Sequence, residues 1–376
     1  MYTIEVKNRY SSLISNSHGE LDDQTKYNIL SDTCSDIGKK LLPKTPKRKW
    51  SNLNKTHNVI EARKSLKHAL ESGSKADIDN ATADLACAYK DSQDTYISTL
   101  THIIEDASYS GRHALAWKVV NEITGRKTIP RPGRPSGSIE ERKKKWKDHF
   151  RNLLCKSPIV PDDDFKISPI VSQDLPIDVT LFKRTELEIA IKQSRRGGAV
   201  GIDVIHLEIW ESKDFFEDLL NLCNKGLTEH IKPSQWSKSA IKPIPKKGST
   251  IVTNHRGISL NCIAAKLYNK MLLNRIQPHV DPILSWTQCG FRKSRSTLSN
   301  IRALRRIIEG LKDKNVPLAL VFIDFSKAFD SIHRDRMFQI LRAYGIPSTI
   351  VDAIKLIYEN SSAQIITPDG ETDFFI

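Results

Sequence analysis

The chain has 376 residues, which exceeds one average domain and favours two or three structural units. Its 58 Lys and Arg against 44 Asp and Glu give a net charge of +14 and a pI near 9.4, a balance that favours a polyanionic partner, most simply nucleic acid. The six scattered cysteines form no CxxC pair, no apolar run approaches ~20 residues, and there is no signal-peptide core, so we expect a soluble intracellular protein, nuclear or cytoplasmic, with no membrane partner.

The first 158 residues are polar and carry a helical period. Residues 58–73 place their apolar side chains on one stripe, which Gly73 closes. The helical pattern continues over residues 77–104. A segment rich in proline and glycine, residues 125–138, then precedes a further helix over residues 139–154. We predict a basic, mostly helical N-terminal extension that ends near residue 158.

A basic run crosses the end of this extension. Between Arg126 and Lys156, eleven Lys or Arg stand against three acids, a net of +8, and Trp146 and Phe150 interleave with them. Basic groups beside aromatic rings suit a sugar-phosphate backbone, although a solvated helix face is the alternative. The residues that we expect to bind nucleic acid are Lys143, Lys144, Lys145, Trp146 and Lys147.

Residues 159–376 alternate between helix and strand signals after a proline-rich boundary. Amphipathic patterns predict helices over residues 215–227, 262–280, 297–315 and 331–344. Thr297 or Ser299 is available to cap the third of these helices, and Gly345 with Pro347 ends the fourth. Strands are predicted over residues 239–248 and 318–323, and a hairpin over residues 363–376.

The predicted strand at residues 318–323 is apolar, short and directly followed by Asp324, which favours a buried central strand with a carboxylate at its end. A buried carboxylate costs desolvation energy unless it is paired, so the position of Asp324 needs an explanation. It could cap the next turn, or it could serve one of three functions. A P-loop ATPase requires GxxxxGK[ST], which does not occur, and a phosphoaspartyl hydrolase would place a second Asp at Ser326. A nucleotidyl-transferring polymerase, with metal ions on strand-end carboxylates, remains the favoured reading.

Several ordered motifs carry a resemblance to a known family. The segments "WSKSAIKPIPKKGST", "NHRGISLNCIAAKLYNKMLLNRI", "TQCGFRKSRSTLSNI" and "FIDFSKAFDSI" occur in this order, and "RRGGAVGIDVIHLEIW" precedes them. Together they resemble the reverse transcriptase of non-LTR (LINE-type) retrotransposons, over roughly residues 185–376. The basic helical half resembles the connector between an endonuclease and the polymerase.

This resemblance implies roles for residues around the first metal-binding motif. Asp324 matches the first metal-binding aspartate, and the backbone carbonyl of Phe325 also faces the metal. Phe329 matches the bulky residue that excludes a ribose 2′-hydroxyl, with a core aromatic as the alternative. We interpret Asp330 as the N-cap of the helix that begins near Ser331.

The resemblance also implies contacts to the incoming nucleotide and the template. Lys246 or Lys247, together with Arg256, match the positions that meet the triphosphate, and the planar fork of an arginine suits phosphate oxygens. The residues that match the motif lining template and nucleotide are Gly290, Phe291, Arg292, Arg295, Ser296 and Thr297.

The chain departs from the family at three points. His255 and Gly257 replace the usual Tyr and Pro on either side of Arg256, and Val200 replaces the usual proline before Gly201, so we expect looser positioning there. A hairpin with paired aspartates, which in the family completes the metal site, does not occur among these residues. We therefore expect the 376 residues to be inactive alone.

These observations predict an α/β (α+β) fold with right-hand polymerase fingers and a partial palm, residues 159–376 with core motifs at 236–376, behind the helical extension. The implied function is RNA-directed DNA synthesis by a two-metal mechanism, with Mg²⁺ as the cofactor, Mn²⁺ as the alternative ion, and an RNA template, a DNA primer and dNTPs as partners. The alternative is a non-catalytic nucleic-acid-binding remnant of a decayed element.

Overall fold

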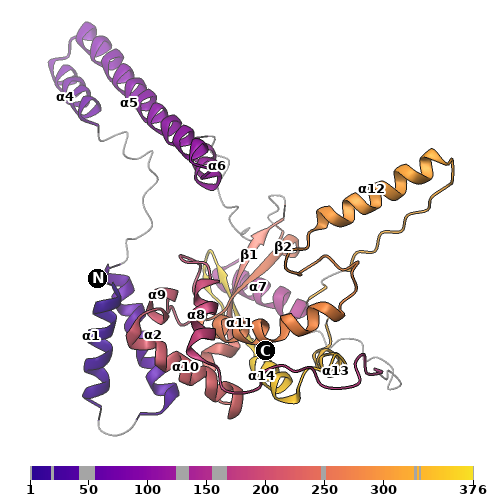
Figure 1. The fold of residues 1–376 in the computed structure, drawn as a ribbon. Helices are drawn as coiled ribbons and strands as arrows, with labels where there is room; N and C mark the ends of the chain where they lie inside the picture. Colours follow the sequence, from indigo (N-terminus) through magenta and orange to yellow (C-terminus); the bar gives the residue numbers. More distant parts are fainter. Residues whose placement is uncertain are drawn as a thin grey trace. The chain divides into compact units, whose positions relative to one another are not determined.

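The computed structural model describes residues 2–17, 21–41, 56–123, 135–154, 167–246, 251–325, 328–329 and 332–375. It combines many helices with one small sheet, in keeping with the predicted α+β class (Figure 1). Two compact units divide the chain, one made of Met1–Leu41 and Pro132–Ile376 and the other of Leu42–Arg131. These units do not follow the boundary expected near residue 158, because the first helices and the basic helix pack with the C-terminal half.

The unit Leu42–Arg131 consists of helices α4 (His57–Ser72), α5 (Lys75–Tyr109) and α6 (His113–Ile123). The predicted end of α4 is confirmed, since Gly73 adopts φ 73° and its N–H donates to the carbonyl of Ala69. Residues 56–123 contain seven Lys or Arg and ten Asp or Glu, a net of −3. The helices of this unit are therefore acidic, and the basic excess of the extension lies outside them.

The larger unit holds the remaining elements. Its helices are α1 (Tyr2–Ser15), α2 (Asp23–Leu41), α7 (Ile139–Leu154), α8 (Arg184–Lys192), α9 (Leu207–Trp210), α10 (Lys213–Thr228), α11 (Ile263–Val280), α12 (Thr297–Asp313), α13 (Arg334–Ala343) and α14 (Ser348–Tyr358). Short 3₁₀ turns lie at Ser234–Ser237, Val252–Asn254 and Asp281–Ile283. The helices predicted within residues 159–376 are thus present as α10, α11, α12 and α13. No helix in the described part of the chain has both the length and the apolar character needed to span a bilayer.

The sheet has four strands in the order β2-β1-β3-β4: β1 (Lys238–Pro245), β2 (His255–Leu260), β3 (Ser362–Thr367) and β4 (Gly370–Glu371). β1 pairs antiparallel with β2 and parallel with β3, and β4 turns back on β3. The parallel pairing ends at Ile241, ahead of Pro243 and Pro245, which have no N–H to donate. The strand predicted over residues 239–248 is present as β1, and the hairpin predicted over residues 363–376 is present as β3 and β4, whereas β2 was not predicted.

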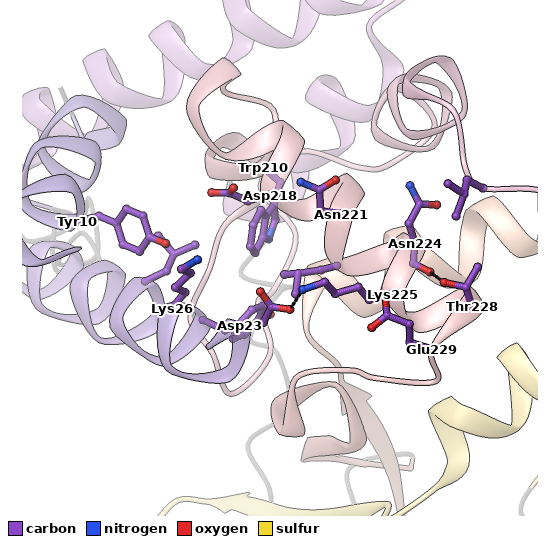
Figure 2. Close-up of a pocket in the computed structure, with 14 residues that line it drawn as sticks. Tyr10, Asp23, Lys26, Trp210, Asp218, Asn221, Asn224, Lys225, Thr228 and Glu229 are labelled. Carbon is purple, nitrogen blue, oxygen red and sulfur yellow. Dashed lines mark hydrogen bonds and ion pairs between the residues drawn. The ribbon is translucent and has the colours of Figure 1, made fainter. Parts of the chain in front are cut away.

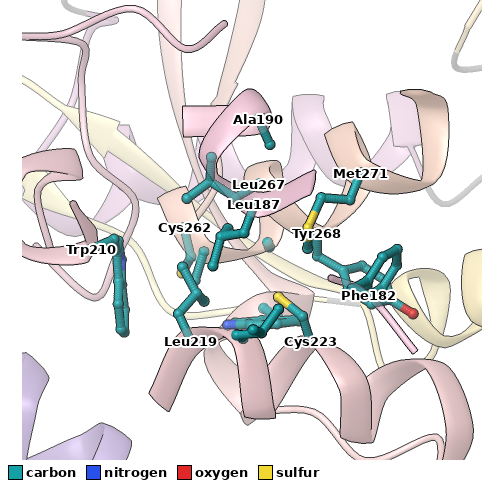
Figure 3. Packing of buried hydrophobic residues seen from close by; sticks show 14 of the residues in the cluster. Phe182, Leu187, Ala190, Trp210, Leu219, Cys223, Cys262, Leu267, Tyr268 and Met271 are labelled. Atoms are coloured by element: carbon teal, nitrogen blue, oxygen red, sulfur yellow. The ribbon is translucent and has the colours of Figure 1, made fainter. Parts of the chain in front are cut away.

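The main core lies among α8, α10, α11 and α14. Figure 3 shows Leu187, Leu219, Cys223 and Tyr268 converging from three of these helices, and each is fully buried. α10 buries one face because its apolar residues recur at helical spacing. At the edge of this core, the buried guanidinium of Arg275 donates to both carboxylate oxygens of Glu186, at 2.6 and 2.8 Å, and to three backbone carbonyls.

A buried hydrogen bond joins the N-terminal helices to this core. The hydroxyl of Tyr27 on α2 donates to Asp203 Oδ2 at 2.7 Å, and Ser31 donates to the backbone carbonyl of Asp203. Burial raises the pKa of Asp203, and the hydrogen bond from Tyr27 opposes that shift. Because a buried carboxylate without a donor is costly, residues upstream of the helical insertion are an integral part of this unit.

α7 lies across one face of the sheet, where Trp146 and Phe150 are fully buried. Their neighbours, which we call the Trp146 cluster, are Ile241, Ala363, Ile365 and Phe375. Arg142 at the start of α7 forms a two-pronged ion pair with Asp369, with N–O distances of 2.7 and 2.9 Å. α7 thereby connects β1, β3 and the turn into β4.

The same packing corrects the expectation of a looser strand around Arg256. His255 is only 4% exposed, and its ring meets Trp146 edge to face at a centroid distance of 4.8 Å. A Cβ on Gly257 would lie 2.7 Å from Phe150 Cε1 and 2.8 Å from Ile241 Cγ2. The two departures therefore fit β2 against α7, and only glycine leaves room for Phe150.

Gly257→Ala should destabilise the larger unit by roughly 1–3 kcal/mol, because the added methyl overpacks the contact with Phe150. Gly310→Ala is the control, since a Cβ there meets nothing within 4 Å and should stabilise α12 by about 1 kcal/mol. Urea unfolding followed by circular dichroism measures both changes.

If the contact with Phe150 is responsible, Gly257→Ala and Phe150→Ala together should cost less than the sum of the two single changes. Strict additivity would show that the glycine is required for another reason.

Candidate nucleotide and nucleic-acid site

The β1–β2 hairpin displays three cations on the face that points away from α7. Side chains alternate along a strand, so Lys242, Ile244 and Lys246 share the face opposite Ile241. Arg256 is the register partner of Ile244 and lies on the same face. We call the set Lys242, Ile244, Lys246 and Arg256 the hairpin face.

The three cations of the hairpin face are exposed and have no hydrogen bond or ion pair through their side chains to another described residue. Lys246 and Arg256 were predicted from the sequence as site residues, and Lys242 was not considered. The signal was present, because Lys242 precedes Lys246 by two full strand periods. Lys247 lies outside the described residues.

The prediction that residues 318–323 form a buried central strand is wrong for this structure. No described strand pairs with them, and Val321, Phe322 and Ile323 are 79–85% exposed. A hydrophobic run becomes a strand only where another strand satisfies its backbone groups, and a sequence pattern does not identify that partner. Asp324 is exposed as well, so the desolvation argument does not apply to it here.

Two of the predicted site residues contact each other across 38 positions of sequence. The rings of Phe291 and Phe329 meet edge to face at a centroid distance of 5.9 Å. Both are exposed, by 94% and 74%, so Phe329 is not a core aromatic in this structure. Phe291 has φ 59°, which turns the chain sharply at this point.

Arg292 is engaged within its own loop rather than open to a ligand. It donates to both carboxylate oxygens of Asp281, at 2.8 and 3.1 Å, and to the carbonyls of Asp281, Ser285 and Gln288. These hydrogen bonds hold the pKa of the Asp281 carboxyl below its ordinary value. The predicted template-lining role of Arg292 is therefore corrected to a loop-stabilising one, because its side chain is only 6% exposed.

The rest of this motif is exposed and leads into α12. Arg295 and Ser296 are exposed, and a Cβ on Gly290 would meet nothing within 4 Å. The N-cap of α12 is Ser296, not Thr297 or Ser299, and its side chain makes no capping hydrogen bond. Thr297 is the first residue of the helix.

The basic helix α7 presents fewer free cations than its sequence suggests. Lys143 lies 4.0 Å from Glu140, Lys145 donates to the carbonyl of Ser136, and Lys147 lies 3.5 Å from Asp373. Trp146 is corrected from a nucleic-acid contact to a core residue, because a fully buried ring cannot stack on a base.

Two further cations define the outer surface of α7. Lys144 and Arg151 are exposed, seven residues apart, and neither side chain has a partner among the described residues. We call this pair the outer face of α7.

Among the described residues, no group of three His, Cys, Asp or Glu side chains could hold a metal ion. Asp324 therefore belongs to no such group, and Asp330, predicted as an N-cap, lies outside the described residues. One carboxylate and the Phe325 carbonyl do not fit a two-metal centre, which needs several converging ligands. No hydrogen bond, ion pair or ring contact between described residues joins Asp324 to the hairpin face.

Comparison with known proteins gives these residues a family context. Residues 244–373 match the family described as "Reverse transcriptase (RNA-dependent DNA polymerase)". The chain is 24% identical over 246 residues to the "Transposon TX1 uncharacterized 149 kDa protein" of Xenopus laevis. It is 26% identical over 179 residues to the "Retrovirus-related Pol polyprotein from type-1 retrotransposable element R2" of Nasonia vitripennis.

A third relative, the "Probable RNA-directed DNA polymerase from transposon BS" of Drosophila melanogaster, is 34% identical over 117 residues. The three matches cover 62%, 47% and 30% of this chain but only 18%, 17% and 13% of the relatives, so the chain spans less than a fifth of their length. Residues 244–373 are therefore similar to a reverse transcriptase domain, and the chain is similar over part of its length to proteins of transposable elements.

Proposed function

We propose that residues 159–376 form the fingers and the first part of the palm of a right-hand polymerase, the reverse transcriptase of a non-LTR retrotransposon. Its reaction is DNA synthesis on an RNA template, from a DNA primer and dNTPs. The observation that carries the proposal is the hairpin face, where Lys246 and Arg256 lie within the matched residues, are exposed and have no side-chain partner among the described residues.

The hairpin face has the chemistry of a triphosphate clamp. The guanidinium of Arg256 can donate two parallel hydrogen bonds to phosphate oxygens, whereas Lys242 and Lys246 act as point charges. Packing of His255 and Gly257 on α7 fixes the strand that presents Arg256. These residues would bind and orient the nucleotide.

We further propose that the complete enzyme uses Mg²⁺, with Mn²⁺ as the alternative ion, and that Asp324 is one of its metal ligands. Two divalent ions ~3.5–4 Å apart require several carboxylates. Among the described residues Asp324 belongs to no group of three ligating side chains, so we propose that these 376 residues bind substrates without polymerising them.

The test of this proposal is primer extension. The 376-residue chain, given primer, RNA template, dNTPs and Mg²⁺, should extend nothing above background. A longer chain that includes a paired-aspartate hairpin should be active, and Asp324→Asn should abolish its activity, since the amide keeps the size but not the charge. Extension by the 376-residue chain that disappears in Asp324→Asn would overturn the account.

In the active longer chain, Arg256→Ala should raise KM for dNTP and lower kcat, because a phosphate clamp acts in both the ground and the transition state. Each charged hydrogen bond that is removed contributes ~1.5–3 kcal/mol, roughly a tenfold to hundredfold loss in kcat/KM. Arg302→Ala, on the exposed helix α12, is the matched control and should be milder. Equal losses at both positions would remove the hairpin face from the nucleotide pocket.

A second candidate function is nucleic-acid binding without catalysis, and the outer face of α7 favours it. Lys144 and Arg151 can each neutralise one phosphate of an RNA strand, whereas the other lysines of the helix are already in contact with the protein. Both candidate functions predict that the chain binds RNA and that loss of these two cations weakens the binding.

Lys144→Glu combined with Arg151→Glu should weaken RNA binding and reduce the slope of log affinity against log salt by roughly 0.7 for each phosphate that the variant no longer neutralises. Filter binding or fluorescence anisotropy at several salt concentrations measures the slope. The control is Lys75→Glu with Lys90→Glu, which changes the net charge equally on exposed positions of the acidic helix α5. The outer face is excluded if its variant keeps the slope of the unmodified chain.

A further inference from the structure

A cavity of about 540 Å³ lies where α1 and α2 lean against α10. Figure 2 shows Tyr10 and Lys26 on the side of α1 and α2, and Asp218 and Asn221 on the side of α10. This volume falls within the range of small-molecule sites, about 300–1,000 Å³. The cavity, which we call the α10 cavity, contains none of the residues assigned above to nucleotide or RNA.

The charges of the α10 cavity are opposite to those of the chain. Its wall contains three carboxylates, from Asp23, Asp218 and Glu229, and two ammonium groups, from Lys26 and Lys225. Lys225 Nζ lies 2.5 Å from Asp23 Oδ2, so these two neutralise each other. Two carboxylates and one ammonium group are left, a local net charge of −1 in a protein of net +14.

The remaining charged groups are available to a ligand. The side chains of Asp218, Glu229 and Lys26 have no hydrogen bond or ion pair to another described residue. Burial raises the pKa of Asp218, and the nearby carboxylates of Asp23 and Glu217 raise it further, while Lys26 opposes them. In such surroundings a cation that binds beside the Asp218 carboxylate stabilises its ionised form.

The wall of the cavity also contains apolar surface, which could contact the hydrocarbon part of a ligand. Leu30, Leu181 and Leu222 line the cavity together with the rings of Tyr10 and Trp210. Burial and the charge of Asp218 raise the pKa of Tyr10 to about 12, so its hydroxyl stays neutral and can donate a hydrogen bond. A phosphate group, in contrast, would face two carboxylates and one ammonium group.

We propose that the α10 cavity binds a guanidinium or alkylammonium group carried on a short apolar stem. The cation pairs with the Asp218 carboxylate, and the stem contacts the leucines and the Tyr10 ring. The ligand is either a free amine or the side chain of an arginine or lysine on a partner. This site is independent of the proposed polymerase function.

The test is calorimetric titration of the 376-residue chain with N-acetyl-arginine amide, using the uncharged citrulline analogue for comparison. The arginine compound should bind and the citrulline compound should not. Asp218→Asn should weaken binding roughly tenfold to hundredfold, because one charged hydrogen bond is removed. Lys26→Met should tighten binding, since it removes the like charge from the wall.

Glu217→Gln is the matched control. It removes the same charge from the adjacent residue of α10, which is exposed, ion-paired with Arg184 and outside the cavity wall. Since the Glu217 carboxylate acts on Asp218 only through space, the affinity of this variant should fall far less than that of Asp218→Asn. Equal weakening by Glu217→Gln and Asp218→Asn, equal binding of the citrulline analogue, or no binding of the arginine compound would each overturn the proposal.

Two further measurements complete the design. Glu229→Gln, at the far end of the wall, should also weaken binding, which keeps the proposal testable if Asp218→Asn fails to fold. Titration with spermidine distinguishes the two sources of the cation. If spermidine competes with the arginine compound and binds more tightly, the ligand is a free amine. If the arginine compound binds more tightly than spermidine, the ligand is a side chain on a partner.

Discussion

The close packing of α7 on the sheet is the constraint on which the hairpin face depends. Trp146 and Phe150 fill the space over Ile241, and the strand that carries Arg256 approaches them so closely that residue 257 must lack a Cβ. The ring of His255 closes the same contact from β2. Since side chains alternate along a strand, burying positions 255 and 257 leaves Arg256 on the opposite, open face. The orientation of Arg256 is thus set by a helix outside the residues that match the family.

Buried polar groups also join distant segments of the chain into the larger unit. Asp203 is buried and needs a donor, which Tyr27 on α2 provides, and Arg275 is buried and needs acceptors, which Glu186 and three carbonyls provide. Each pairing is costly to break, because it would leave a buried polar group without a partner. The described helices of the unit Leu42–Arg131 differ in charge from the chain as a whole, since residues 56–123 carry a net charge of −3.

The elements that were predictable from sequence are those whose signal is local. The apolar stripe of α10, the left-handed Gly73 at the end of α4 and the alternation in β1 depend on neighbours only a few residues away. The predictions that were wrong concern residues whose contacts lie far away in the sequence. Trp146 looked like a stacking residue because it stands among lysines, but the sheet that covers it lies about a hundred or more residues later. Arg292 looked free because nothing in its motif reveals Asp281 as its acceptor.

The two halves of the candidate site differ in what holds them together. The hairpin face is fixed by ladder hydrogen bonds between β1 and β2 and by the Trp146 cluster, all within the described residues. Asp324, the proposed metal ligand, follows an exposed apolar segment that no described strand pairs with. A carboxylate in water carries no desolvation cost and is not preorganised, so it gains a metal only when other ligands converge on the same ion. The hairpin face and Asp324 therefore differ in the contacts that support them, and a change that disrupts the packing of the hairpin face need not disturb Asp324.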